Sequence, residues 1–108
     1  MISYDDAEKA LDYLKNTDKE AARLRAYADS LDDLKKNVVA MLVNEITEKM
    51  SAADKLKKAE GSPEYHSHIE KLRKAKDEWF AMQNKRNSAA IQIDMWRSVN
   101  SNQRKGNI

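Results

Sequence analysis

Apolar residues recur along this chain at steps of three and four positions, the spacing of helices that bury one face. Two long stripes and one short stripe have this spacing, and the mean steps of the two long stripes are about 3.6 and 3.4 residues, close to the repeat of packed helices. They comprise Tyr4, Ala7, Leu11 and Leu14; Leu24, Tyr27, Leu31, Leu34, Val38, Leu42, Ile46, Met50, Ala53 and Leu56; and Tyr65, Ile69, Leu72, Ala75, Trp79, Met82, Arg86, Ala89, Ile93 and Trp96. The pattern predicts an all-α protein.

Few residues interrupt these stripes, and their positions predict where helices end. Gly61, Ser62 and Pro63 form the strongest break, because serine caps a helix, proline suits its first position and glycine ends the preceding helix. Thr17 followed by Glu20 has the spacing of a capping box and indicates a second break. We expect one helical domain over residues 1–108, with helices at about 4–15, 18–59 and 63–99 and a polar tail at 100–108.

Helices of this length exceed what a compact domain of 108 residues requires, since about 40 residues span roughly 60 Å. The sequence therefore predicts an elongated antiparallel helical hairpin, coiled-coil-like, with a short N-terminal helix. Folding at Gly61 would pair Leu42 with Trp79. In the same register Arg86, the one charged residue of the third stripe, would lie near Leu34.

Some segments are apolar on more than one side of the predicted helices. Residues 38–43 are apolar all round, and residues 89–93 together with Met95 and Trp96 are nearly so. A two-helix hairpin covers one stripe per helix, so the additional apolar faces require further neighbours. We expect a homo-oligomer whose interface includes Val39, Val43, Phe80 and Ile91. Alternatively, the short first helix folds further back and covers this surface within one chain.

Charge is distributed unevenly along the chain, which has 20 Lys and Arg against 18 Asp and Glu. Residues 1–34 carry a net charge of −4 and residues 35–108 a net charge of +6. The predicted hairpin tip is basic, and clustered cations favour phosphate binding through counterion release. The candidate nucleic-acid-binding residues are Lys55, Lys57, Lys58, Arg73 and Lys74 at the tip, and Arg97, Arg104 and Lys105 near the C-terminus. A solvated lysine-rich face and a surface for acidic proteins are the alternatives.

The residue patterns of common catalytic and metal sites are missing. The chain has no cysteine, no glycine-rich phosphate or dinucleotide loop and no nucleophile elbow. His66 and His68 are two positions apart, so they diverge on a helix and cannot share an ion. We therefore expect no enzymatic activity, no metal and no cofactor. Without a long apolar run or an apolar leader, the expected location is the cytoplasm, with no membrane contact.

The C-terminal half carries a set of residues that together suggest a family. They are Ala59, Ser62-Pro63-Glu64-Tyr65, Lys85-Arg86, Ala89-Ala90, Met95-Trp96-Arg97-Ser98 and the tail 101–108. Over residues 59–108 this set resembles small helical phage proteins that accompany single-strand-annealing recombinases and single-strand-binding proteins. It is similar in outline to the recombination-mediator proteins of T-even phages.

The resemblance implies a phage-type accessory protein of DNA recombination or replication, acting in the host cytoplasm. Its partners would be single-stranded DNA and a recombinase or single-strand-binding protein. The alternative class is a protein-interaction module without nucleic-acid contact, such as a coiled-coil adaptor, an assembly factor or a small phage inhibitor of a host enzyme.

Overall fold

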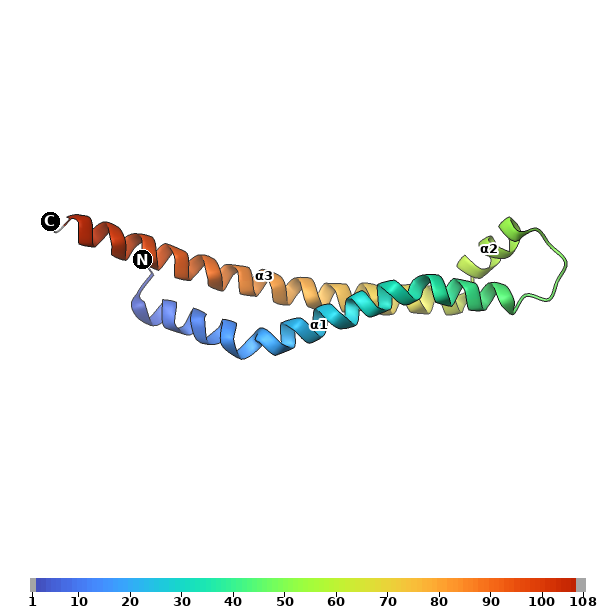
Figure 1. The fold of residues 1–108 in the computed structure, drawn as a ribbon, viewed down its shortest axis with the longest axis horizontal. Helices are drawn as coiled ribbons and strands as arrows, with labels where there is room; N and C mark the ends of the chain where they lie inside the picture. The colour runs from blue at the N-terminus through green and yellow to red at the C-terminus, as the bar shows by residue number, and fades with distance from the viewer. Residues whose placement is uncertain (1, 107–108) are drawn as a thin grey trace. The chain divides into compact units, whose positions relative to one another are not determined.

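The computed structural model describes residues 2–106, with side chains for residues 2–103. The chain forms three α-helices, α1 (Tyr4–Asn44), α2 (Ala52–Glu60) and α3 (Pro63–Gly106), and no strand within that range (Figure 1). The all-α fold predicted from the apolar spacing is confirmed. Two compact units divide the chain: a terminal unit of residues 1–23 and 80–108, and a central unit of residues 24–79.

Helix α1 begins at a serine cap and continues through the predicted break near residue 17. Ser3 Oγ accepts a hydrogen bond from Asp6 N at 3.2 Å, and Asp6 Oδ2 accepts one from Ser3 N at 3.1 Å, a reciprocal pair that satisfies a helix start. Thr17 Oγ1 instead donates to Tyr13 O at 2.7 Å. A threonine bonded to the carbonyl four residues earlier remains inside a helix. The predicted division into helices 4–15 and 18–59 is therefore wrong.

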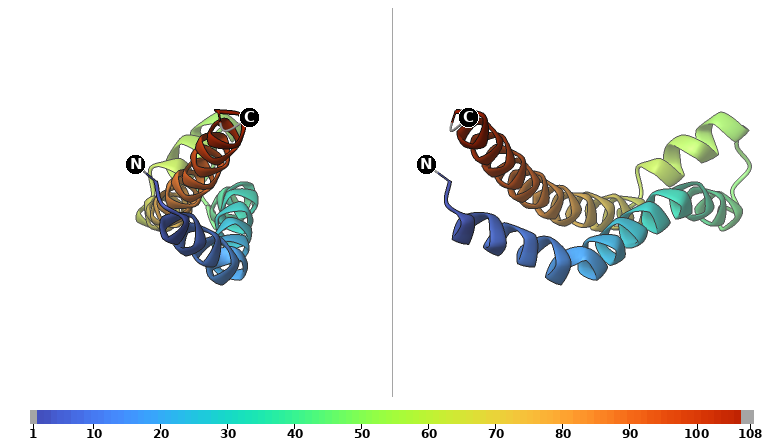
Figure 2. Two further views of the ribbon diagram at one scale, coloured as in Figure 1. Left: turned by 90° about the vertical axis from the view of Figure 1, so that its left-hand side faces the viewer. Right: turned by 60° about the vertical axis from the view of Figure 1, so that its left-hand side comes forward.

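The chain leaves the helical conformation at residues 45–51, where a continuous helix was predicted. Ser51 caps α2, because its Oγ accepts a hydrogen bond from Asp54 N at 3.1 Å. Lys58 Nζ lies 3.0 Å from Glu48 Oε1, and this ion pair connects α2 to the segment that precedes it. Figures 1 and 2 show α2 returning alongside the end of α1, so the chain reverses before α2 and not at Gly61.

The junction between α2 and α3 has the predicted caps, but its glycine has an ordinary conformation. Ser62 Oγ accepts a hydrogen bond from Tyr65 N at 3.2 Å, and Pro63 is the first residue of α3. Gly61 has φ −87° and ψ −2°, which other residues adopt readily. Helix α3 continues to Gly106, because no proline or glycine interrupts residues 64–105. The predicted helix end at residue 99 is therefore wrong.

A small core of alanine and leucine joins α1 to α3 in the central unit. Ala28, Leu31, Leu72 and Ala75 form one buried cluster, with exposed fractions of 3%, 9%, 6% and 4%. His68 lies beside this cluster, with its Nε2 2.8 Å from the carbonyl oxygen of Leu31. The narrow core follows from the small size of alanine, which lets two helices approach closely.

The register in the central unit differs from the predicted one. The guanidinium of Arg25 lies over the ring of Trp79 at 5.8 Å, whereas the sequence paired Trp79 with Leu42. Asp32 Oδ2 lies 3.8 Å from Lys76 Nζ. The prediction treated residues 45–60 as the last part of the second long helix, paired with the start of the third. In the structure these residues form the connecting segment and α2, so different residues of the two long helices lie opposite each other.

Alanines and an aromatic pair join α1 to α3 in the terminal unit. Ala7, Ala10 and Ala89 are buried, with exposed fractions of 7%, 4% and 6%. Tyr4 and Trp96 meet edge to face, with ring centroids 5.6 Å apart, a favourable geometry for two aromatic rings. Large side chains contribute little to the buried part of this unit.

Arg86 adds a polar connection to the terminal unit. Its Nη1 donates to Leu14 O at 2.8 Å and to Thr17 Oγ1 at 2.7 Å, and its Nη2 lies 3.2 Å from Asp18 Oδ1. Arg86 was predicted to lie near Leu34, and this is wrong because the connecting segment and α2 change the register between the two long helices. A polar residue between packed helices favours the one alignment in which its partners are present.

Candidate interaction surfaces

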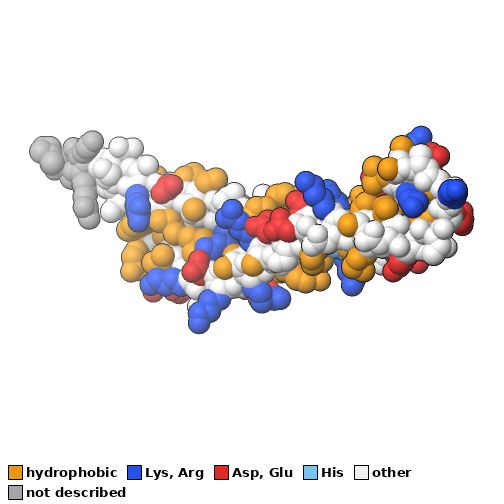
Figure 3. Space-filling model, turned by 45° about the vertical axis from the view of Figure 1, so that its right-hand side comes forward, with side chains coloured by type: hydrophobic (Ala, Val, Ile, Leu, Met, Phe, Trp, Pro, Cys, Tyr) orange, Lys and Arg blue, Asp and Glu red, His pale blue; other side chains and the backbone are white. Residues whose placement is uncertain are grey.

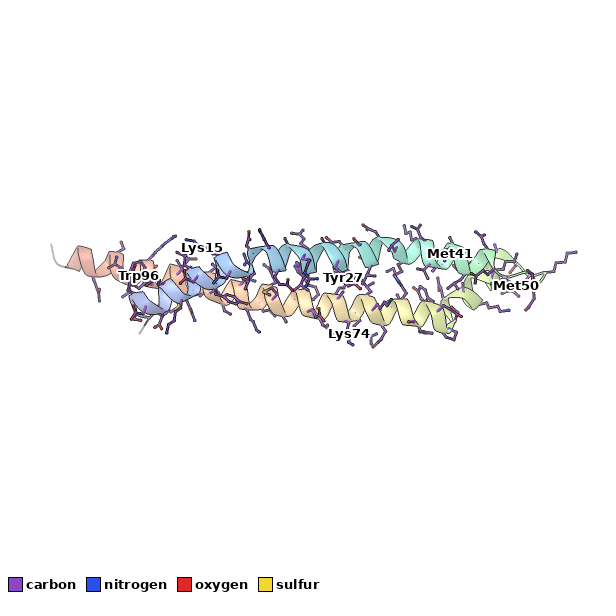
Figure 4. All side chains as sticks on the ribbon, turned by 90° about the horizontal axis from the view of Figure 1, so that it is seen from below. Lys15, Tyr27, Met41, Met50, Lys74 and Trp96 are labelled. Carbon is purple, nitrogen blue, oxygen red and sulfur yellow. The ribbon has the colours of Figure 1, made fainter. Side chains whose placement is uncertain are left out.

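The eight basic residues predicted to bind nucleic acid fall into three groups. The central unit contains Lys55, Lys57 and Lys58 on α2 and Arg73 and Lys74 on α3; Figure 4 labels Lys74. Arg97 is exposed on α3 in the terminal unit. Arg104 and Lys105 belong to the last turns of α3, but their side chains lie outside the described residues.

Acidic neighbours offset much of the positive charge of the central unit. Lys58 pairs with Glu48, and Arg73 Nη1 lies 3.4 Å from Glu70 Oε2. Residues 24–79 contain eleven Lys and Arg and eleven Asp and Glu, so this unit as a whole is neutral. Lys55, Lys57 and Lys74 make no ion pair among the described side chains.

Large apolar side chains lie mainly on the surface, and small ones form the core. In the described part of the chain the exposed large residues are Tyr4, Leu11, Tyr27, Leu34, Met41, Leu56, Phe80, Ile91 and Met95. Among the buried apolar residues with described side chains, only Leu24, Leu31 and Leu72 are larger than alanine. Figure 3 shows hydrophobic side chains gathered in patches on the drawn face. Exposed patches of this kind mark interaction surfaces.

Two apolar series run along α1 in the central unit. Leu24 and Leu31 are seven residues apart and each 9% exposed, whereas Tyr27, Leu34 and Met41 are also seven apart but 52%, 46% and 60% exposed. Together they occupy the a and d positions of a coiled-coil heptad repeat. The first series is buried while the second, which we term the exposed ridge, remains in water (Tyr27 and Met41 are labelled in Figure 4).

A hollow of about 380 Å³ lies between α1 and α3 in the terminal unit. Its floor contains the buried residues Ala10 and Ala89, and exposed Lys9 and Lys85 stand on either side. We term it the alanine hollow; its further lining residues are Tyr13, Ser88 and Gln92. Because both floor residues are alanine, the two helices leave space that larger side chains would fill.

The hydroxyl protons in the alanine hollow are already engaged within the chain. Tyr13 Oη donates to Met82 Sδ at 3.5 Å, and Ser88 Oγ donates to Asn84 O at 3.0 Å. Lys9 and Lys85 form no ion pair among the described residues. The hollow therefore presents two ammonium groups above an apolar floor, an arrangement suited to a partner that is both apolar and acidic.

The interface residues predicted from the sequence differ in exposure. Phe80 and Ile91 are 50% and 57% exposed, whereas Val39 and Val43 are half-buried. Tyr27 and Leu34 were predicted to lie in a buried stripe, so the exposed ridge was not predicted. Their heptad spacing was the available signal, but spacing does not tell which of two adjacent series is covered.

Two surface carboxyl groups have shifted acidity, and both belong to local helix contacts. Hydrogen bonds from the backbone and side chain of Ser3 lower the pKa of Asp6. A hydrogen bond from the Arg23 guanidinium lowers the pKa of Glu20. Within the described residues no three His, Asp or Glu side chains gather where they could hold a metal ion. The same residues include no helix whose length and apolarity would let it cross a bilayer.

Comparison with known protein families, with curated proteins and with solved structures found no match to this chain. The resemblance of residues 59–108 to phage recombination-mediator proteins therefore stays a hypothesis.

Proposed function

We propose that this protein is a non-enzymatic helical interaction module that assembles with further copies of itself, and that each copy is an elongated antiparallel hairpin. The distribution of side-chain size supports this proposal: large apolar residues are exposed while the core is mainly alanine. A small scaffold with a thin core gains stability by burying such residues against another copy.

The expected strength of association follows from the exposed ridge. A half-exposed large side chain keeps on the order of 100 Å² in water, and burying it contributes about 2.5 kcal/mol at 25 cal/mol per Å². Three such residues contribute about 7 kcal/mol, against an association cost of about 4–15 kcal/mol. The ridge alone therefore supports weak association at most, and a stable assembly requires additional contacts such as ion pairs.

Binding of single-stranded DNA is the second candidate function. Lys55, Lys57 and Lys74 favour it, since none of them is paired among the described side chains. Combined with the sequence resemblance, they support an accessory role in phage DNA recombination or replication, in which a recombinase or single-strand-binding protein would occupy the apolar surface. We place this candidate second because the central unit is neutral overall, and binding to phosphates depends on cationic contacts.

Light scattering on the full chain separates the two functions. The solution mass would be measured with and without a short single-stranded oligonucleotide, at about 50 mM and about 200 mM salt, because phosphate-driven binding weakens steeply over that range. We expect a mass above that of the monomer at high protein concentration, unchanged by the oligonucleotide. A mass increase that depends on the oligonucleotide and disappears at the higher salt would favour the DNA-binding role instead.

A further inference from the structure

The exposed ridge carries an unpaired acidic group beside its central residue. Asp33 immediately precedes Leu34, is exposed, and forms no ion pair among the described residues. On a helix, neighbouring residues lie about 100° apart, so Asp33 borders the ridge without interrupting it. The ridge therefore combines large apolar side chains with a carboxylate.

The alanine hollow has the complementary character. Lys9 and Lys85 flank an apolar floor, and the hydroxyl protons nearby are engaged elsewhere. Alanines at a helix–helix contact permit axes to approach to about 8 Å, so a third helix can lie against the hollow. A volume of about 380 Å³ leaves room for a leucine side chain.

We infer that the exposed ridge of one copy docks into the alanine hollow of a second copy, with Leu34 entering the hollow and Asp33 facing Lys85. This inference rests on the proposed self-association and names its two surfaces. Charge complementarity selects a second copy as the occupant, because the ridge is apolar and acidic whereas the hollow is apolar and basic. Docking would also bury the exposed one of the two heptad series on α1, which a single chain leaves in water.

The two surfaces differ, so the contact has a direction. An interface between unlike surfaces leaves one ridge and one hollow unused at the ends of every open assembly. Assemblies of this kind close into a ring or continue as a filament. A two-fold symmetric dimer, in which the ridge of each copy enters the hollow of the other, would use both surfaces at once and would not grow.

Charge reversal on each surface tests the contact. The variants Asp33→Lys and Lys85→Glu should each weaken self-association at least tenfold, since like charges would face each other. Asp77→Lys and Lys71→Glu are matched controls, because these exposed residues lie outside the ridge and the hollow and are not ion-paired among the described side chains. Circular dichroism would verify that all four variants keep the helical content of the original chain.

Mixing the two variants tests whether these two surfaces pair with each other. In an equimolar mixture every ridge again finds a hollow of opposite charge on a copy of the other variant, so the mixture should associate as strongly as the original chain. Sedimentation velocity would measure the masses of each variant, of the mixture and of the original chain. Restored association in the mixture, with weak association in each variant separately, is the expected result.

The outcomes distinguish this inference from the proposed function. If the original chain associates and both reversal variants associate equally well, the ridge–hollow contact is wrong and self-association stands. The same conclusion follows if the control variants weaken association as strongly, or if the mixture associates no more strongly than either variant alone. If the original chain stays monomeric at every concentration, both proposals fail.

Discussion

Replacing Arg86 with methionine tests how the terminal unit is held together. The Arg86 side chain is 19% exposed and reaches three acceptors on α1: Leu14 O, Thr17 Oγ1 and Asp18 Oδ1. Methionine keeps an apolar stem of similar length and removes the guanidinium. The Arg86→Met variant should therefore lose the polar contacts while retaining most of the packing.

The expected loss of stability follows from the three contacts. A hydrogen bond from a charged donor contributes about 1.5–3 kcal/mol once the exchange with water is counted, and the bonds to Leu14 O and Thr17 Oγ1 share one nitrogen of Arg86, Nη1. Asp18 is 78% exposed, so its ion pair contributes at most about 1 kcal/mol. We expect a net decrease of about 2 kcal/mol in the free energy of unfolding, which corresponds to a lower Tm by on the order of 10 °C.

Thermal and urea unfolding followed by circular dichroism would measure this decrease, at one fixed protein concentration because association also affects stability. Asp18→Asn is the matched control: it keeps the shape of the side chain and should cost less than about 0.5 kcal/mol. If Arg86→Met were as stable as the original chain, or more stable, the polar connection would contribute nothing and the reasoning would be refuted.

Three further predictions concern other parts of the chain. Ser51→Ala removes the cap of α2 and should cost about 1 kcal/mol, with faster amide hydrogen exchange confined to α2; unchanged exchange there would contradict the cap. Ala75→Leu overpacks the central core, where Ala75 is 4% exposed, and should cost about 1–3 kcal/mol in urea unfolding, while an equal or higher stability would show that the core has room. Asp6 and Glu20 have lowered pKa values in the folded chain, so the folded state binds fewer protons than the unfolded state, and stability should fall as the pH drops below the ordinary pKa values of 3.8 for Asp6 and 4.5 for Glu20. The variant pair Asp6→Asn and Glu20→Gln should flatten that acid dependence in a pH series of Tm values, and an unchanged slope would contradict the assignment.

The sequence predicted helices and some of their boundaries because those features depend on local chemistry. Ser62 and Pro63 begin α3 as predicted, since a cap and a fixed φ act within a few residues. Thr17 misled the prediction because a threonine hydroxyl can bond backward within a helix as well as cap a new one. Ser51 and Asp54 carried the signal for α2, but the apolar residues around them continued the helical stripe and obscured it.

The candidate surfaces could be predicted only in part. Heptad spacing identified the apolar positions of α1, but the covered series depends on the register between α1 and α3. That register depends on where the chain reverses, and the sequence placed the reversal at Gly61 instead of at residues 45–51. The exposed ridge and the alanine hollow therefore became visible only once the long helices were placed against each other within each unit.

Sedimentation equilibrium of the full chain, from low to high micromolar concentration, tests the self-association proposal most directly. We predict an average mass that rises with concentration beyond that of one chain, because the large apolar side chains leave water only in an assembly. A mass equal to one chain across the whole range would contradict the account.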